Sequence, residues 1–338
     1  MPARDNLLGD LRDRYQEFWL LIRGIDPKQA NPMLGYPLWS YVIAGAWAFP
    51  GSFIASKFVF LVVQILLFSA VAVSLKRCSQ LGWPLAMLVL AASVPAHIAY
   101  DLASWGNYGL VLMACFWFSF VACKPLLRGV SLGIVIVKPQ VGIVAWLAAL
   151  LRVDWPPMLI GGLIFICESL IGAYFLKKEA ISYFFSTLSG GFSGRLDHFY
   201  STGNYGIVGN FVQSGLLPTN LVLPILLAVY LLVLAALFKL LVDPVHRYVV
   251  TVALFPIFCY HRTHDLMLFL PLLFVLIRDS LRHSGLRSYF YLLPLVWSCS
   301  FRETQPIPLL ILVLMVAIWF CWIVPSPSPS PATEELAT

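Results

Sequence analysis

The chain has 338 residues, of which 60% are hydrophobic and only 11% are charged. Soluble domains carry roughly 25% charged residues, so the composition excludes an ordinary soluble protein and requires much of the surface to face lipid. The net charge of +6 is small and is spread along the chain, which argues against nucleic acid as a partner.

The first 36 residues are predicted to form an external segment that lies against the membrane. Residues 10–23 follow the period of an amphipathic helix, which Gly24 and Pro27 end. Such a helix binds a membrane surface or packs against a membrane domain. Its apolar stripe consists of Leu11, Tyr15, Phe18, Trp19 and Ile22, and the opposite face carries Asp10, Arg14 and Glu17.

Carboxylates of this segment are candidates for a general base. Asp10 is expected at the lipid–water boundary, where a lipid-linked substrate presents its head group, and Asp26 follows the helix. Each also has a structural interpretation, because aspartate is favoured as a helix N-cap and in a turn before proline. The sequence leaves Asp10, Asp13 and Asp26 open as the base.

The rest of the chain predicts an all-α protein, a polytopic bundle of about eleven transmembrane helices. Several are shorter than the ~20 residues that a perpendicular span needs, so we expect short, broken helices. Only Lys138-Pro139 separates two half-length stretches, and segment 37–50 is expected to lie at the interface or to re-enter the membrane. The expected spans are 53–76, 83–101, 106–123, 126–137, 139–151, 156–176, 218–242, 247–260, 264–278, 287–301 and 306–324.

Residues 37–324 therefore form a transmembrane domain, and residues 325–338 form a disordered tail of proline and serine. Lysines and arginines favour the cytoplasmic side. The spans alternate without contradiction if Arg128, Arg152, Arg247 and Arg278 lie on that side. The long loop 177–216 and the polar residues that interrupt the apolar stretches then share the external side, which predicts one external active site.

Ionisable groups at membrane depth are costly and indicate functional sites. Lys138 needs an anionic partner there, either a phosphate or a structural acid. Late in the chain, Arg262 offers a planar fork that matches phosphate oxygens. The neighbouring His261, His264 and Asp265 could ligate a metal, but their spacing at a helix start favours hydrogen bonding, so we expect no metal.

Four short motifs, in this order, resemble those of family 87 glycosyltransferases of the GT-C superfold. Asp10-Leu11-Arg12, Gly24-Ile25-Asp26-Pro27 and Tyr36-Pro37-Leu38-Trp39-Ser40 together resemble the first external loop of that family. Gly106-Asn107 resembles its Gly-Gln-x-Asn-like segment, Lys138-Pro139-Gln140 its Lys-Pro break, and Tyr260-His261-Arg262 with Asp265 its late His-containing segment.

The resemblance implies a GT-C-like membrane enzyme of the cell envelope, similar to mannosyltransferases. Such an enzyme moves a hexose or pentose, with inversion, from a polyprenyl-phosphate-linked donor to an external glycan or glycolipid acceptor. The donor is a co-substrate, so no cofactor is expected. The implied place is the bacterial inner membrane, crossed many times, with the active site on the periplasmic face.

Carried onto this sequence, the resemblance makes Asp10 the base, with Asp26 as its rival. It implies that the donor phosphate is bound by Lys138, Arg262, His261 and His264. It implies further substrate contacts from Arg14, Tyr36, Asn107, Gln140 and Asp265.

Two departures from the family pattern stand out. Members usually carry a first transmembrane helix before this loop, whereas nine residues precede Asp10, so either the start lies upstream or the helix is missing. A second proline is also more usual where Leu38 stands. A transporter or flippase for a lipid-linked or anionic solute is the alternative function, since broken helices with buried cations also build such sites. A scaffold subunit is a third interpretation, raised by the missing helix.

Overall fold

The computed structural model describes residues 9–27, 38–48, 51–93, 108–179, 182, 219–258, 267–282 and 316–320. Within these ranges every regular element is a helix, which confirms the expected all-α bundle. The helices are α1 (Gly9–Ile22), α3 (Leu38–Ala48), α4 (Phe53–Ser79), α5 (Trp83–Ser93), α7 (Gly109–Val121), α8 (Pro125–Val135), α9 (Pro139–Leu151), α10 (Trp155–Leu176), α14 (Thr219–Leu240), α15 (Pro244–Phe258) and α16 (Phe269–Arg282).

The helices follow the predicted spans closely from residue 53 to residue 282. In the described part of the chain, α4 and α10 are long and apolar enough to cross a membrane, with mean hydropathies of 2.6 and 2.0. Several other apolar helices are short, as predicted. The expected span 287–301 and the tail 325–338 lie outside the described residues, as does most of span 306–324.

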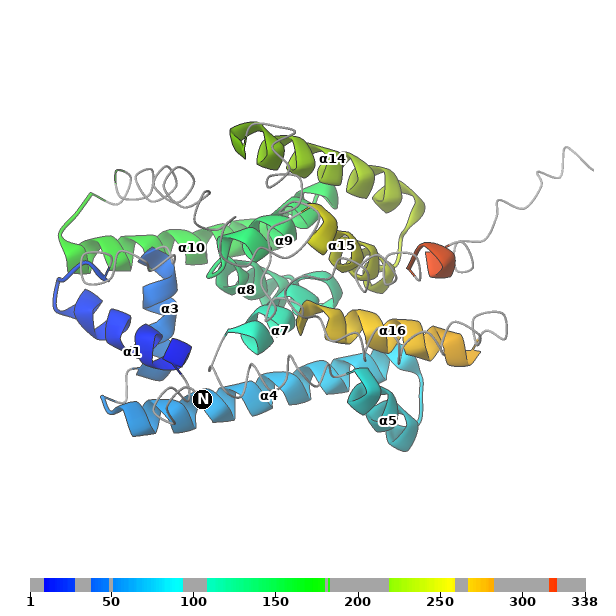
Figure 1. Cartoon of the computed structure of the whole chain (residues 1–338), viewed down its shortest axis with the longest axis horizontal. Coiled ribbons are helices and arrows are strands. Elements are labelled where there is room, and N and C mark those ends of the chain that lie inside the picture. The colour runs from blue at the N-terminus through cyan, green and yellow to red at the C-terminus, as the bar shows by residue number, and fades with distance from the viewer. Residues whose placement is uncertain are drawn as a thin grey trace, which may run out of the picture.

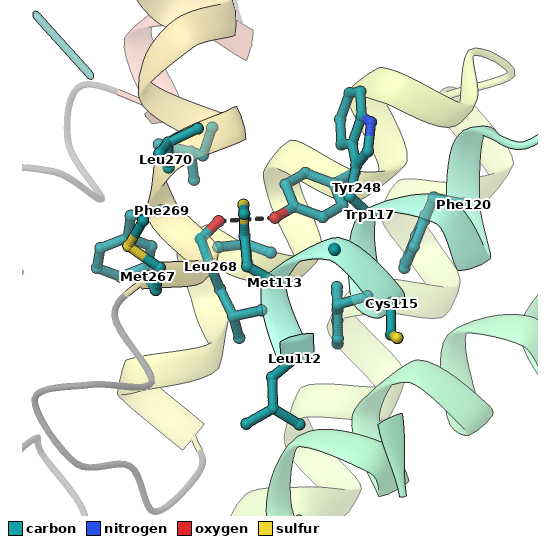
Figure 2. Packing of buried hydrophobic residues seen from close by; sticks show 14 of the residues in the cluster. Leu112, Met113, Cys115, Trp117, Phe120, Tyr248, Met267, Leu268, Phe269 and Leu270 are labelled. Carbon is teal, nitrogen blue, oxygen red and sulfur yellow. Dashed lines mark hydrogen bonds between the residues drawn. The ribbon is translucent and has the colours of Figure 1, made fainter. Parts of the chain in front are cut away.

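The core is built around α7, which is buried along most of its length. Trp117 of α7 packs edge-on against Tyr248 of α15, with ring centroids 4.9 Å apart. The Tyr248 hydroxyl donates a 2.7 Å hydrogen bond to the carbonyl of Leu268, just before α16 (Figure 2). A buried hydroxyl needs such an acceptor, so this bond fixes α15 against the start of α16.

Helix α10 presents one face to protein and the other outward. The protein side of α10 lies against α8, where a Cβ on Gly129 or Gly133 would come within 3.0 Å of Ile160 or Ile164. Small residues spaced by four let transmembrane helices approach closely. The outward side carries large exposed apolar side chains at helical spacing, as expected for a lipid-facing surface: Leu159, Leu163, Ile166, Leu170 and Tyr174.

The amphipathic helix of the first segment is confirmed as α1, and it packs against α3 and one end of α10 (Figure 1). It ends where predicted, since Gly24 adopts a positive φ of 74°. Its polar face differs from a membrane-surface helix, because Arg14 and Glu17 are buried and form an ion pair with each other. Protein therefore covers Arg14 and Glu17 of the predicted polar face, while Arg12 and Gln16 are exposed.

Candidate functional site

The helical structure is interrupted at Lys138-Pro139, as the sequence predicted. Helix α8 ends at Val135, and α9 begins at Pro139. Proline has no backbone N–H, so the carbonyl four residues earlier loses its normal donor. The amides of Val141 and Gly142 both bond to the Lys138 carbonyl, at 3.0 and 2.9 Å, which starts the new helix.

Two side chains of α3 satisfy carbonyls that the break sets free. The Trp39 indole N–H donates to the Ile136 carbonyl at 2.8 Å, and the Ser40 hydroxyl donates to the Val137 carbonyl at 2.6 Å. Within a membrane, unpaired carbonyls cost several kcal/mol. The first residues of α3 therefore hold the break in place, 97 residues away in sequence.

Helix α10 also packs against Trp39. The ring of Phe165 packs edge-on against Trp39, with centroids 4.8 Å apart. Since Trp39 and Ser40 contact the break and Trp39 also contacts α10, the first turn of α3 is tied to the neighbourhood of Lys138. This is the spatial relation that a shared site of first-loop residues and Lys138 requires.

Lys138 itself is only 4% exposed. Its backbone is extended, with φ −117° and ψ 98°, so it stands between the two helices and belongs to neither. A lysine ammonium buried at this position calls for a nearby negative charge. Lys138 therefore brings its positive charge to the break itself.

Gly142 is essential to the tightness of the break. A Cβ at this position would lie 2.5 Å from the Ile136 Cα and 3.0 Å from the Ile136 nitrogen. Both atoms belong to the backbone, so no side-chain rotation relieves the clash. The first turn of α9 packs onto the last turn of α8 only because this residue has no side chain.

The first-segment acids lie in different surroundings. The Asp26 carboxylate is buried and accepts a 2.7 Å hydrogen bond from Lys178, which follows α10. A Cβ on Gly24 would lie 3.2 Å from the Phe175 carbonyl, so the turn after α1 closely approaches the end of α10. This ion pair joins the first segment to the carboxyl end of α10.

Asp10 and Asp13 lie on α1, and Gln140 lies on α9. The backbones of Asp10 and Gln140 lie in the first turns of α1 and α9, but their side chains lie outside the described residues. Asp13 is half-buried on α1. The remaining predicted site residues are outside the described ranges: Tyr36, Asn107, His261, Arg262, His264 and Asp265.

The opposite end of the bundle collects basic residues. Arg128 Nη2 lies 3.3 Å from Asp154, immediately before α10, and Arg152 donates to the Ser119 carbonyl at the end of α7. Burial lowers the pKa of Arg152 to about 10, against the raising effect of Asp154. Twenty-two residues of α10, a length of ~33 Å, separate this end from Lys178, which is about the thickness of a bilayer core.

The comparisons with known proteins identify the family. The family model described as glycosyltransferase family 87 matches residues 36–277, which is more than half of the chain. The chain belongs to glycosyltransferase family 87. It is thus a membrane glycosyltransferase of the GT-C type, and the match includes Tyr36, Lys138 and the 260–265 motif. Neither the curated proteins nor the solved structures contain a match to it.

The family match begins at Tyr36, so Asp10, Asp13 and Asp26 precede it. Sequence reasoning also missed contributors to this region. The sequence shows Trp39 and Ser40 only as parts of a motif and Lys178 only as part of a loop, whereas all three make contacts that organise this region. The useful signal was Pro139, because freed carbonyls require donors from elsewhere in the chain.

His261, His264 and Asp265, the residues weighed as metal ligands, lie outside the described ranges. Within those ranges, no group of three or more His, Cys, Asp or Glu side chains gathers. The arrangement offers a buried cation at a helix break that Trp39 and Ser40 of α3 hold in place. That combination suits recognition of a phosphate by charge and hydrogen bonds.

Proposed function

We propose that this glycosyltransferase takes its sugar, a hexose or a pentose, from a polyprenyl-phosphate-linked donor. The observation that carries the proposal is the closure of the Lys138 break by Trp39 and Ser40. It ties a buried cation to the start of the transmembrane domain, close to where the first segment ends. The family match favours this function over a transporter.

In the proposed mechanism, Lys138 holds the donor phosphate and neutralises its charge. The leaving group departs as a phosphate that is already charged, so cations suffice and no acid is needed. Arg262 provides a second cation, with His261 and His264 assisting through hydrogen bonds. The apolar spans hold the polyprenyl tail in lipid while the head group reaches the break.

A carboxylate takes the proton from the acceptor hydroxyl as that oxygen attacks the anomeric carbon, and the configuration inverts. We propose Asp10 for this role. The ion pair with Lys178 supports a structural function for Asp26, in which it holds the turn after α1 against α10. Arg14, Tyr36, Asn107, Gln140 and Asp265 complete the proposed substrate contacts.

The proposed location is the bacterial inner membrane, with the site on the periplasmic face. The basic residues at the far end of α10 support this orientation, because positive charge favours the cytoplasmic side. The acceptor is then a glycan or glycolipid of the cell envelope. Donor and acceptor are both presented at the membrane surface.

Sugar transfer by the purified protein from a polyprenyl-phosphate sugar tests the proposal, with Asp10→Asn and Asp26→Asn compared with the wild type. Loss of the base should lower the rate at least a hundredfold, so Asp10→Asn is expected to be nearly inactive. Asp26→Asn should keep most of the activity. Full activity of Asp10→Asn would remove the proposed base, and absence of transfer by the wild type would refute the donor.

A further inference from the structure

The basic end of the bundle has features beyond the structural use of its charges. In the short connection between α9 and α10, Arg152 and Asp154 flank Val153, and Arg128 reaches the same acid from α8. Arg247 of α15 lies near enough for its charge to act on Arg152. Among the described residues, Asp154 forms ion pairs with both Arg128 and Arg152. One negative charge therefore faces several positive charges, so positive charge is in excess.

The arginines retain hydrogen-bonding capacity that protein does not use. Arg152 donates one bond to the Ser119 carbonyl, and its guanidinium stacks 4.5 Å from the Phe120 ring centroid. The Nε atoms of Arg128 and Arg152 are buried, yet neither has a hydrogen-bond partner. Buried donors without acceptors are rare in native proteins and indicate a missing group.

Val153 adds an independent observation. It adopts a φ of 55°, a left-handed conformation that β-branched residues rarely take. Such backbone strain concentrates at ligand sites. Here it shapes the three-residue turn that carries Arg152 and Asp154.

The surroundings indicate the kind of anion. Large apolar side chains near the arginines are exposed, with Val153 at 62%, Leu126 at 63% and Trp155 at 54%. A free anion in water gains nothing from such a rim, whereas the acyl chains and interfacial region of a lipid match it. Arginine forks bind phosphate oxygens through paired hydrogen bonds.

We propose that the turn between α9 and α10 binds the phosphate of an anionic phospholipid, with Arg128 and Arg152 as its ligands. Basic pockets between transmembrane helices on the cytoplasmic side are suited to such head groups. The bound lipid supplies the acceptors that the two Nε atoms lack. It also offsets the repulsion among Arg128, Arg152 and Arg247. This site lies at the ends of α8 and α9 that are away from Lys138, and it is independent of the proposed reaction.

The test is native mass spectrometry of the full-length purified protein with phosphatidylglycerol and, separately, with phosphatidylcholine. We expect the wild type to retain phosphatidylglycerol preferentially. Arg128→Gln should weaken its binding about fivefold, and Arg128→Lys should restore only part of it, because lysine keeps the charge but lacks the planar fork. Arg77→Gln is the matched control. Arg77 is an exposed arginine at the end of α4, and its substitution removes the same charge.

Three results would overturn the inference. The first is equal retention of the two lipids by the wild type. The second is equal binding by Arg128→Gln and Arg77→Gln, since a diffuse charge effect predicts that equality. The third is displacement of phosphatidylglycerol by millimolar inorganic phosphate, because that would make the site one for a free anion. Thermal unfolding of each variant, measured alongside, separates lost binding from lost folding.

Discussion

Replacing Gly142 by alanine should force the break at Lys138 open. The new Cβ would lie 2.5 Å from the Ile136 Cα, whereas carbon atoms in contact are separated by about 3.5–4.0 Å. The first turn of α9 must therefore move by about 1 Å relative to the end of α8. Overpacking of this kind costs about 1–3 kcal/mol, and the better helix propensity of alanine returns at most about 1 kcal/mol.

Gly162 of α10 provides the matched control for this substitution. A Cβ there would meet only Trp146, at 3.7 Å, which is ordinary van der Waals contact. Gly162→Ala should therefore be neutral or slightly stabilising. Both variants make the same chemical change within an apolar helix, so their difference reports the geometry of the break.

The assay is unfolding of the purified protein in detergent, by temperature and by denaturing detergent, followed by donor kinetics. Gly142→Ala is expected to be less stable than Gly162→Ala by about 1–2 kcal/mol and to bind donor more weakly, because Lys138 shifts with the turn. Equal stability of the two variants would refute the close backbone approach at residues 136–142.

Three further predictions concern individual hydrogen bonds, each measured by unfolding of the purified protein. Ser40→Ala and Trp39→Phe each leave a carbonyl of the break without its donor and should cost about 1–2 kcal/mol, and a loss near zero in both would contradict the closure of the break by α3. In a double-mutant cycle, Asp26→Asn and Lys178→Met should couple by less than about 1 kcal/mol, because Lys178 is 41% exposed, and a larger coupling would show that the pair is more shielded than its exposure indicates. Tyr248→Phe should cost about 1–2 kcal/mol by removing the buried bond to the Leu268 carbonyl, and wild-type stability would mean that this bond contributes nothing net.

The helical order of the bundle was accessible from sequence because apolar length and turn residues are local signals. The break between α8 and α9 followed from one residue, Pro139, whose missing N–H weakens a helix and here marks the start of a new one. The end of α1 at Gly24 followed in the same way from a positive φ that glycine tolerates.

The tertiary relations were not accessible, because they pair residues far apart in the chain. Nothing local in the sequence indicates that Trp39 and Ser40 donate to carbonyls near residue 137. The burial of Arg14 and Glu17 likewise depends on their ion pair and on the covering elements. A helical period alone assigns such residues to a polar face and cannot show what covers that face.

The same limit applies to the proposed site. The sequence identified Lys138 from its cost in an apolar stretch, and its 4% exposure agrees with that reasoning. It could not separate Asp10 from Asp26, because both are aspartates beside turns. The ion pair of Asp26 with Lys178, a contact 152 residues apart, supports our proposal of Asp10 as the base.

Steady-state transfer by Lys138→Gln, compared with the wild type, tests the central claim most directly. A phosphate held by Lys138 predicts that kcat/KM for a polyprenyl-phosphate sugar falls about tenfold to a hundredfold, while the KM for the acceptor is unchanged. Wild-type kcat/KM for the donor in a variant that remains folded would contradict the account.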